Sequence, residues 1–142
     1  MNTDTGSKTL ESMSQAVWYN RWTLNKFKKY LKGEILEVGC GIGNFTKGLK
    51  EYGDIYAVDI DRSYIDEVKK LVNVKAGFGD IETGKYFFDN QQFDSIVCLN
   101  VLEHIQNDNQ ALKNLYKLLK NEGFLTTLKH SWSFHHILVF TF

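Results

Sequence analysis

The stretch Glu37-Val38-Gly39-Cys40-Gly41-Ile42-Gly43-Asn44 decides the fold of this 142-residue chain. It continues an apolar strand pattern, and a helix-like segment follows from Phe45. Glycines at alternate positions let the backbone approach a ligand closely, because glycine has no Cβ and tolerates positive φ. We expect that ligand at the start of the helix, where free N–H groups and the helix dipole favour an anionic group. The stretch therefore predicts a nucleotide-like ligand between a strand and a helix.

Two better-known nucleotide loops do not match this stretch. The dinucleotide fingerprint G-x-G-x-x-G requires glycine where Asn44 or Thr46 stands, which disfavours a nicotinamide-dependent oxidoreductase. Gly43 and Gly48 have the spacing of a phosphate-binding P-loop, but the lysine of that motif is displaced to Lys50. The remaining pattern, E-x-G-x-G-x-G, resembles the first motif of class I S-adenosylmethionine (SAM) dependent methyltransferases.

Strands and helices alternate along the rest of the chain. The predicted strands are 34–38, 55–59, a short one near 74–76, 93–99 and 124–128; the predicted helices are 12–31, a short one from 45, one around 64–72 and one around 111–119. For the last helix we expect Asp108 or Asn109 as the cap and Gly123 as the end. This alternation predicts an α/β fold, a Rossmann-like doubly wound and mostly parallel sheet with helices on both faces. Ligands of such sheets bind beyond the carboxyl ends of the strands, where the glycine loop lies.

Two acidic segments match later motifs of the same family. Asp59 ends the second predicted strand, twenty residues after Gly39, where a carboxylate can accept both ribose hydroxyl protons. Asp61 is the near alternative. Asp80, in Gly79-Asp80-Ile81, resembles the family residue that accepts from the adenine amino group. The alternative for Asp80 is an ordinary turn in which its side chain caps a helix.

The segment from Phe93 to Ile105 resembles the fourth motif of the family, F-D-x-[IV]-x-x-x-x-V-L-E-H. The resemblance implies that Asn100 contacts the methionine moiety and that Glu103 and His104 face the substrate opening. His104 is a candidate catalytic base, since an imidazole with a pKa near 6.5 suits proton removal. The alternative is a structural role at the start of a short helix. Quinone-modifying relatives that bind a metal here carry a further carboxylate where Asn100 stands, so we expect no metal site.

The resemblance implies SAM as the cofactor and methyl transfer as the activity. The residues expected to bind SAM are Glu37, Gly39, Cys40, Gly41, Gly43, Asp59, Ile60, Asp80, Ile81 and Asn100. The expected methyl acceptor is a small-molecule, lipid or sugar-linked compound. The alternative function is a SAM-binding module with little or no catalysis, because substrate-side elements that the family places after the fifth strand are missing.

The composition limits the binding partners that we expect and indicates a cellular compartment. Lys and Arg total 17 and balance 17 Asp and Glu, so no overall charge favours nucleic acid or an anionic membrane. The polar start has no apolar signal region, and no stretch is long enough for a membrane span. Cys40 and Cys98 lie at predicted strand ends without metal-ligand spacing. They are typical of reduced thiols in a cytoplasmic protein.

The two ends of the chain differ from its centre. We expect a flexible N-terminus over 1–12 and a single domain over 13–142, with an N-terminal helix at 13–33 and an atypical tail at 130–142. Residues 13–22 resemble bacterial methyltransferases found near or fused to glycosyltransferases; Tyr19, Arg21 and Trp22 there are either a lid over the cofactor or aromatic core packing.

The tail carries no Asp, Glu, Lys or Arg after residue 129, and its apolar run predicts a strand. That strand would pair with the fifth predicted strand or with a second subunit, which would make a homodimer. A second interpretation is a truncated or out-of-frame ending that leaves the C-terminal strands incomplete.

Overall fold

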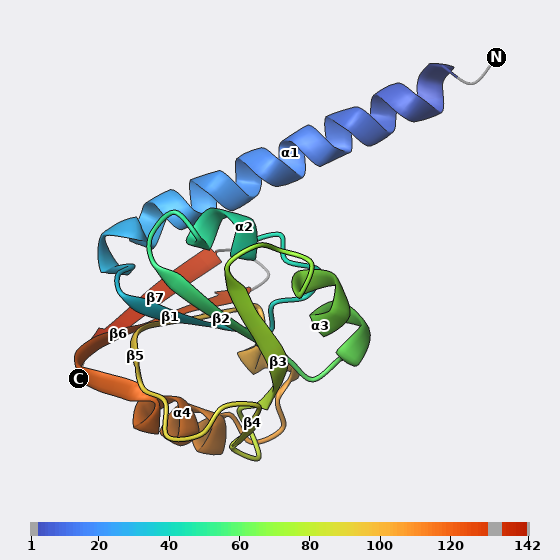
Figure 1. Ribbon diagram of the computed structural model, residues 1–142. Coiled ribbons are helices and arrows are strands. Elements are labelled where there is room, and N and C mark those ends of the chain that lie inside the picture. The colour runs from blue at the N-terminus through green and yellow to red at the C-terminus, as the bar shows by residue number, and fades with distance from the viewer. Residues whose placement is uncertain (1–2, 131–134, 142) are drawn as a thin grey trace.

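A seven-stranded sheet forms the centre of the computed structural model, which describes residues 3–130 and 135–141 (Figure 1). Its strand order is β4-β3-β2-β1-β5-β6-β7. The strands are β1 Glu34–Val38, β2 Asp54–Asp59, β3 Val74–Asp80, β4 Lys85–Tyr86, β5 Phe93–Leu99, β6 Leu119–His130 and β7 His135–Thr141. Strands β1, β2, β3, β5 and β6 run parallel, whereas β4 and β7 are antiparallel to their neighbours. The mostly parallel sheet predicted from the sequence is confirmed.

Helices cover both faces of this sheet, as the doubly wound prediction requires. The helical elements are α1 Thr3–Phe27, η1 Lys28–Tyr30, α2 Thr46–Leu49, α3 Arg62–Val68, η2 Leu102–His104 and α4 Asp108–Lys117. Side chains of α1, α2 and α3 share one apolar cluster with one face of the sheet, and side chains of α4 share a second cluster with the other. Figure 1 shows α4 on the side of the sheet opposite α1 and α2.

Side chains along each central strand point alternately to one apolar cluster and to the other. In β1, Ile35 points to the α1 side and Leu36 to the α4 side, and both are fully buried. In β5, Val97 and Ile96 divide in the same way. Because both faces of these strands are covered, their sequences are almost continuously apolar.

The strand order reverses at β1, and this reversal places the glycine loop. The chain leaves β1 to build β2 and β3 on one side and then returns to build β5 on the other side of β1. The carboxyl ends of β1, β2 and β5 therefore meet at one edge of the sheet, at the topological switch point where doubly wound folds bind ligands.

The segment after α4 differs from the prediction. The helix begins with Asn107 as its cap, whose side-chain oxygen accepts from Gln110 N at 3.0 Å, so the expected caps Asp108 and Asn109 are wrong. The helix ends at Lys117, and Gly123 lies inside β6 rather than at the helix end. The apolar pattern predicted that the helix continues to about residue 119. Instead, the chain enters β6 at Leu119, and β6 pairs with β5 across a register shift near Phe93.

The tail forms β7, which pairs antiparallel with β6 from Phe124↔Thr141 to His130↔His135. This confirms the predicted strand and its pairing with the fifth predicted strand. Residues 131–134 and 142, also part of the predicted tail, lie outside the described residues. The third predicted strand is longer than expected, since β3 continues to Asp80.

Helix α1 packs on the sheet only through its C-terminal part. Leu24 and Phe27 are buried, whereas Met13 and Val17 are more than half exposed. Figure 1 shows the N-terminal part of this helix extending beyond the sheet. None of the described helices is long and apolar enough to cross a membrane.

Phe27→Ala tests this docking. Phe27 is fully buried in the α1-side cluster, so its truncation should lower the free energy of unfolding by about 3–5 kcal/mol in urea titrations. Val17→Ala, on the exposed part of the same helix, should change it by less than about 0.5 kcal/mol. Equal effects of the two substitutions would contradict the docking of α1 through its C-terminal end.

Candidate cofactor site

The Asp59 carboxylate joins the glycine loop to the end of β2. Its Oδ2 accepts from the Gly41 amide at 2.9 Å, and its Oδ1 accepts from the Asp61 amide at 3.0 Å. Asp59 is only 9% exposed, so these charge-assisted bonds lie in a partly dehydrated setting. The carboxylate therefore fixes the loop at a set position beside the second strand.

Three further loop amides also have acceptors. Gly39 N and Cys40 N both donate to the Val58 carbonyl, at 2.8 and 3.1 Å, and Gly43 N donates to the Cys40 carbonyl at 3.0 Å. A phosphate-binding loop needs such amides free to face the ligand. The anionic group expected at this helix start therefore remains a prediction. The α2 helix that follows is a single short turn of four residues and adds little dipole.

The three loop glycines have different reasons for being glycine. All have positive φ: 70° at Gly39, 52° at Gly41 and 92° at Gly43. A Cβ on Gly39 would lie 2.4 Å from Val101 Cγ2, and one on Gly43 would lie 3.2 Å from Leu71 Cδ1. A Cβ on Gly41 would meet no atom within 4 Å. Gly41 therefore borders open space, whereas the other two glycines are needed for packing.

Glu37 is a buried acid beneath the loop. It is 4% exposed, and the Thr46 hydroxyl donates to its Oε2 at 2.5 Å. Burial raises the pKa of Glu37 to about 8; the Thr46 hydrogen bond opposes this shift and the nearby Asp59 charge adds to it. Thr46 was not predicted as a site residue. Its position at the first residue of α2, the helix that follows the loop, is the only sequence signal for this role.

The two candidate ribose ligands take different roles. Asp61 is exposed and caps α3, since its Oδ1 accepts from Ser63 N at 2.8 Å and from Ser63 Oγ at 2.6 Å. These hydrogen bonds lower the pKa of Asp61. Asp59 instead lies at the glycine loop, beside the open space at Gly41. The geometry thus supports the preference for Asp59, whose ribose contact remains a prediction.

The residues predicted to surround the adenine differ in how accessible they are to a ligand. Asp80 ends β3, and its Oδ1 accepts from Glu82 N at 2.9 Å, which is the turn-capping role held as the alternative. Ile60 is 69% exposed beside the loop, whereas Ile81 is 3% exposed within the α4-side cluster. The exposed Ile60 is positioned to cover a ligand; adenine contacts of Asp80 and Ile81 remain predictions.

The end of β5 carries an unsatisfied polar group. Asn100 has a left-handed backbone, φ 56°, which asparagine tolerates better than most residues. Its side-chain Oδ1 is buried and has no hydrogen-bond partner. A buried acceptor without a donor costs stability, so this oxygen is suited to a ligand N–H. His104 and Glu103 lie beyond it on η2 and are both exposed.

Both cysteines are free, buried thiols. Burial raises the pKa of Cys40 and of Cys98 to about 12, and the Glu37 and Asp59 charges contribute at Cys40. Neither thiol is therefore an activated nucleophile. Cys40 packs in the α1-side cluster, so its contribution to the loop is its backbone and its fit to the core.

The aromatic residues predicted as a lid or as core packing face another part of the sheet. Tyr19 and Trp22 line a cavity between α1 and the β6–β7 hairpin, and Arg21 lines a separate groove between α1 and α2 that includes Asn44. The lid role of these residues remains a prediction.

Together, the fold and the loop define a class: a doubly wound α/β domain with a glycine loop at the switch point beside β1, where such folds bind ligands. The model of the methyltransferase domain family matches residues 36–127, which run from β1 through β6. The chain therefore belongs to this family of SAM-dependent methyltransferases.

Individual relatives agree with this assignment. A ubiquinone biosynthesis O-methyltransferase of Coxiella burnetii is 34% identical over 111 residues, covering 72% of this chain and 47% of that protein. A Pyrococcus horikoshii protein superposes with a TM-score of 0.67 at 23% identity, over 92% of this chain and 58% of that one. Coclaurine N-methyltransferase, in a structure with N-methylheliamine and SAH, reaches 0.67 at 19% identity, over 80% and 35%. The chain spans about half the length of the curated relatives it matches.

Glu37→Gln tests the buried acid through the pH dependence of stability. The folded pKa of about 8 exceeds the ordinary glutamate value of 4.5, so the native state binds the extra proton between these values. The free energy of unfolding should therefore fall as pH rises through this window. Gln keeps an oxygen that accepts from Thr46 but does not titrate. In urea titrations from about pH 5 to about pH 9, the wild type should lose stability relative to the variant; parallel curves would contradict the raised pKa.

Gly41→Ala tests the open space at the loop. The added Cβ meets no protein atom, so the fold should lose only the strain of a positive φ, about 1–2 kcal/mol. SAM affinity should fall at least about tenfold in calorimetric titrations, because the methyl group occupies ligand space. Asn90→Ala provides the matched strain control, with φ 50° at the amino end of β5. Unchanged SAM affinity in Gly41→Ala would show that the ligand lies elsewhere.

Proposed function

We propose that this chain binds SAM at the carboxyl ends of β1, β2 and β5 and that its methyl group goes to a small-molecule acceptor. The observation that carries the proposal is the pairing of the Asp59 carboxylate with the Gly41 amide beside open space. A carboxylate at that position repels phosphate, yet it accepts readily from ribose hydroxyls. A nucleoside cofactor without phosphates suits this site better than a dinucleotide.

The remaining residues fit the other parts of SAM. The orphaned Asn100 Oδ1 is an acceptor for the amino group of the methionine moiety, and Ile60 presents an exposed apolar side chain beside the loop. The Asp59 carboxylate places an acidic group beside the loop, where a cationic cofactor is favoured electrostatically. When bound, SAM supplies a methyl group on a sulfonium that a nucleophile displaces. The task of the protein is to hold the nucleophile in line and exclude water.

The name of the Coxiella relative supports a hydroxyl group as the methylated site. A hydroxyl nucleophile must lose its proton during transfer, and we assign His104, on η2 just beyond β5, as the candidate base. A lipid or sugar-linked acceptor is a narrower form of the same proposal. The two free thiols fit a cytoplasmic setting, where cysteines stay reduced.

Asp59→Ala and Asp61→Ala form the matched test of this site. Asp59→Ala should weaken SAM binding by about 100-fold or more in calorimetric titrations, since it removes a charged acceptor and frees the glycine loop. Asp61→Ala should lower stability by about 1 kcal/mol through the lost helix cap and leave SAM affinity nearly unchanged. Weaker SAM binding in Asp61→Ala, with unchanged binding in Asp59→Ala, would assign the ribose contact to Asp61. Absence of SAM binding in the wild type would refute the proposal.

A further inference from the structure

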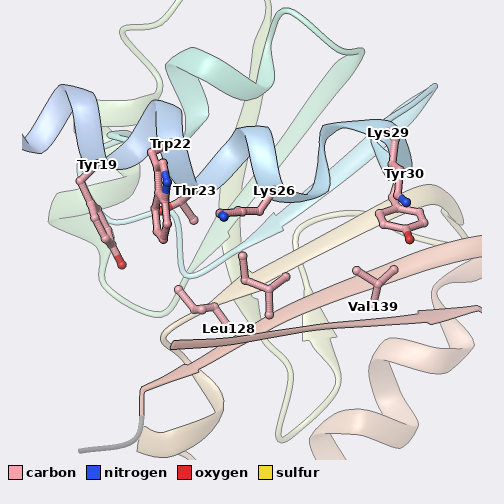
Figure 2. Close-up of a pocket in the computed structure, with 9 residues that line it drawn as sticks. Tyr19, Trp22, Thr23, Lys26, Lys29, Tyr30, Leu128 and Val139 are labelled. Carbon is pink, nitrogen blue, oxygen red and sulfur yellow. The ribbon is translucent and has the colours of Figure 1, made fainter. Parts of the chain in front are cut away.

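A cavity of about 560 Å³ lies between α1 and the β6–β7 hairpin, apart from the glycine loop. Figure 2 shows Tyr19, Trp22 and Thr23 projecting from α1 toward Leu128 of the hairpin, and Val139 of the hairpin lying below Tyr30. The cavity thus has aromatic walls on the helix side and an aliphatic floor on the sheet side. Such a lining suits a flat, apolar body.

The charged residues that line this cavity are all positive. Lys26 and Lys29 line it together with aromatic rings, and no Asp or Glu occurs among its described lining residues. Lys26 Nζ lies 4.6 Å from the centroid of the Trp22 ring, and Lys29 Nζ lies 4.9 Å from that of Tyr30. These cation–π contacts hold both ammonium groups at the cavity. A ligand with an anionic group would gain from both charges.

Thr23 supplies an independent indication of a ligand. It is 1% exposed, it lines the cavity, and its Oγ1 is buried without a hydrogen-bond partner. A buried hydroxyl without a partner is costly, and native proteins rarely leave one unless a ligand or water satisfies it. The hydroxyl of Thr23 therefore offers a ligand a buried hydrogen-bonding group in the wall of the cavity.

The floor of the cavity is linked to the carboxyl end of β5 through one backbone hydrogen bond. The carbonyl of Leu128, on its floor, accepts from the Asn100 amide at 3.1 Å. Asn100 directly follows β5, whose carboxyl end lies at the switch point. The floor of the cavity is therefore bonded directly to the strand end from which transfer would occur.

We propose that this cavity receives the methyl acceptor and that the acceptor is an anion with a flat apolar body, such as an aromatic carboxylate. Lys26 and Lys29 pair with the anionic group, Trp22 and Tyr30 flank the apolar body, and Thr23 bonds to a polar atom of the ligand. Identification of the ligand as the acceptor rests on the proposed function. Binding of the ligand does not, because the cavity is formed without the cofactor.

The test uses 2-naphthoate and its uncharged isostere 2-naphthamide as probes of the full chain without cofactor. Isothermal titration calorimetry should show 2-naphthoate binding about tenfold or more tightly than the amide, the size expected for one charge-assisted hydrogen bond. In ¹H–¹⁵N spectra the indole signal of Trp22 should shift. No binding of 2-naphthoate, or equal binding of both probes, would overturn the inference.

Three variants locate the binding. Lys26→Met and Lys29→Met should each weaken 2-naphthoate binding severalfold and remove the preference over the amide when combined. Lys28→Met is the matched control, since this exposed neighbour does not line the cavity, and its affinity should match that of the wild type. A loss in Lys28→Met equal to that in Lys26→Met would show nonspecific attraction to the basic helix end and would overturn the site.

Thr23→Val separates ligand binding from folding. Valine has the shape of threonine but no hydroxyl, so the melting temperature of the unliganded variant should stay equal or rise. The affinity for 2-naphthoate should fall severalfold. A lower melting temperature with unchanged affinity would show that the hydroxyl serves the fold. Failure of these probes with intact SAM binding would reject the cavity alone, whereas loss of SAM binding would reject the proposed function.

Discussion

The site depends on one buried carboxylate between two backbone segments. Asp59 accepts from the loop at Gly41 and from its own strand end at Asp61, so the glycine loop is fixed to β2 rather than held by a ligand. This bond also uses the Gly41 amide, which is therefore not available to a phosphate group. The same carboxylate leaves further lone pairs for ribose hydroxyls. One interaction thus shapes the loop and selects the cofactor.

The acidity beneath the loop follows from the same arrangement. Glu37 lies close enough to Asp59 for the charge of Asp59 to raise its pKa, and burial raises it further. A protonated Glu37 that accepts from Thr46 avoids two adjacent buried charges. Protonation of Glu37 therefore lowers the negative charge of the free site. A cofactor that brings positive charge is compatible with such a site.

Sequence alone predicted the parts of the fold that depend on local patterning. Apolar continuity identified the central strands, and the glycine spacing identified the loop and its place at the switch point. The sequence spacing correctly placed Asp59 beside the glycine loop. The reason is that β1 and β2 are parallel neighbours joined by one helical turn, which leaves the two strand ends few possible relative positions. The end of α4 was predicted wrongly because the pairing of β6 with β5, a tertiary contact, replaced the helical pattern through Gly123.

Other features of the site could not be predicted because they depend on where amides and side chains point. The glycine pattern is the same whether its amides face a ligand or, as here, Val58 and Asp59. The cavity joins Lys26 with Val139, residues brought together only by the docking of α1 on the hairpin. The unpaired state of Asn100 Oδ1 likewise appears only once the surrounding packing is known.

The most direct measurement of the central claim is a calorimetric titration of the full chain with SAM and, separately, with NAD. The two share an adenosine unit, but only NAD carries the bridging phosphates that a loop occupied by Asp59 cannot accept. We expect SAM to bind with one site per chain and NAD to give no heat of binding. Binding of NAD without binding of SAM would contradict the assignment of the glycine loop.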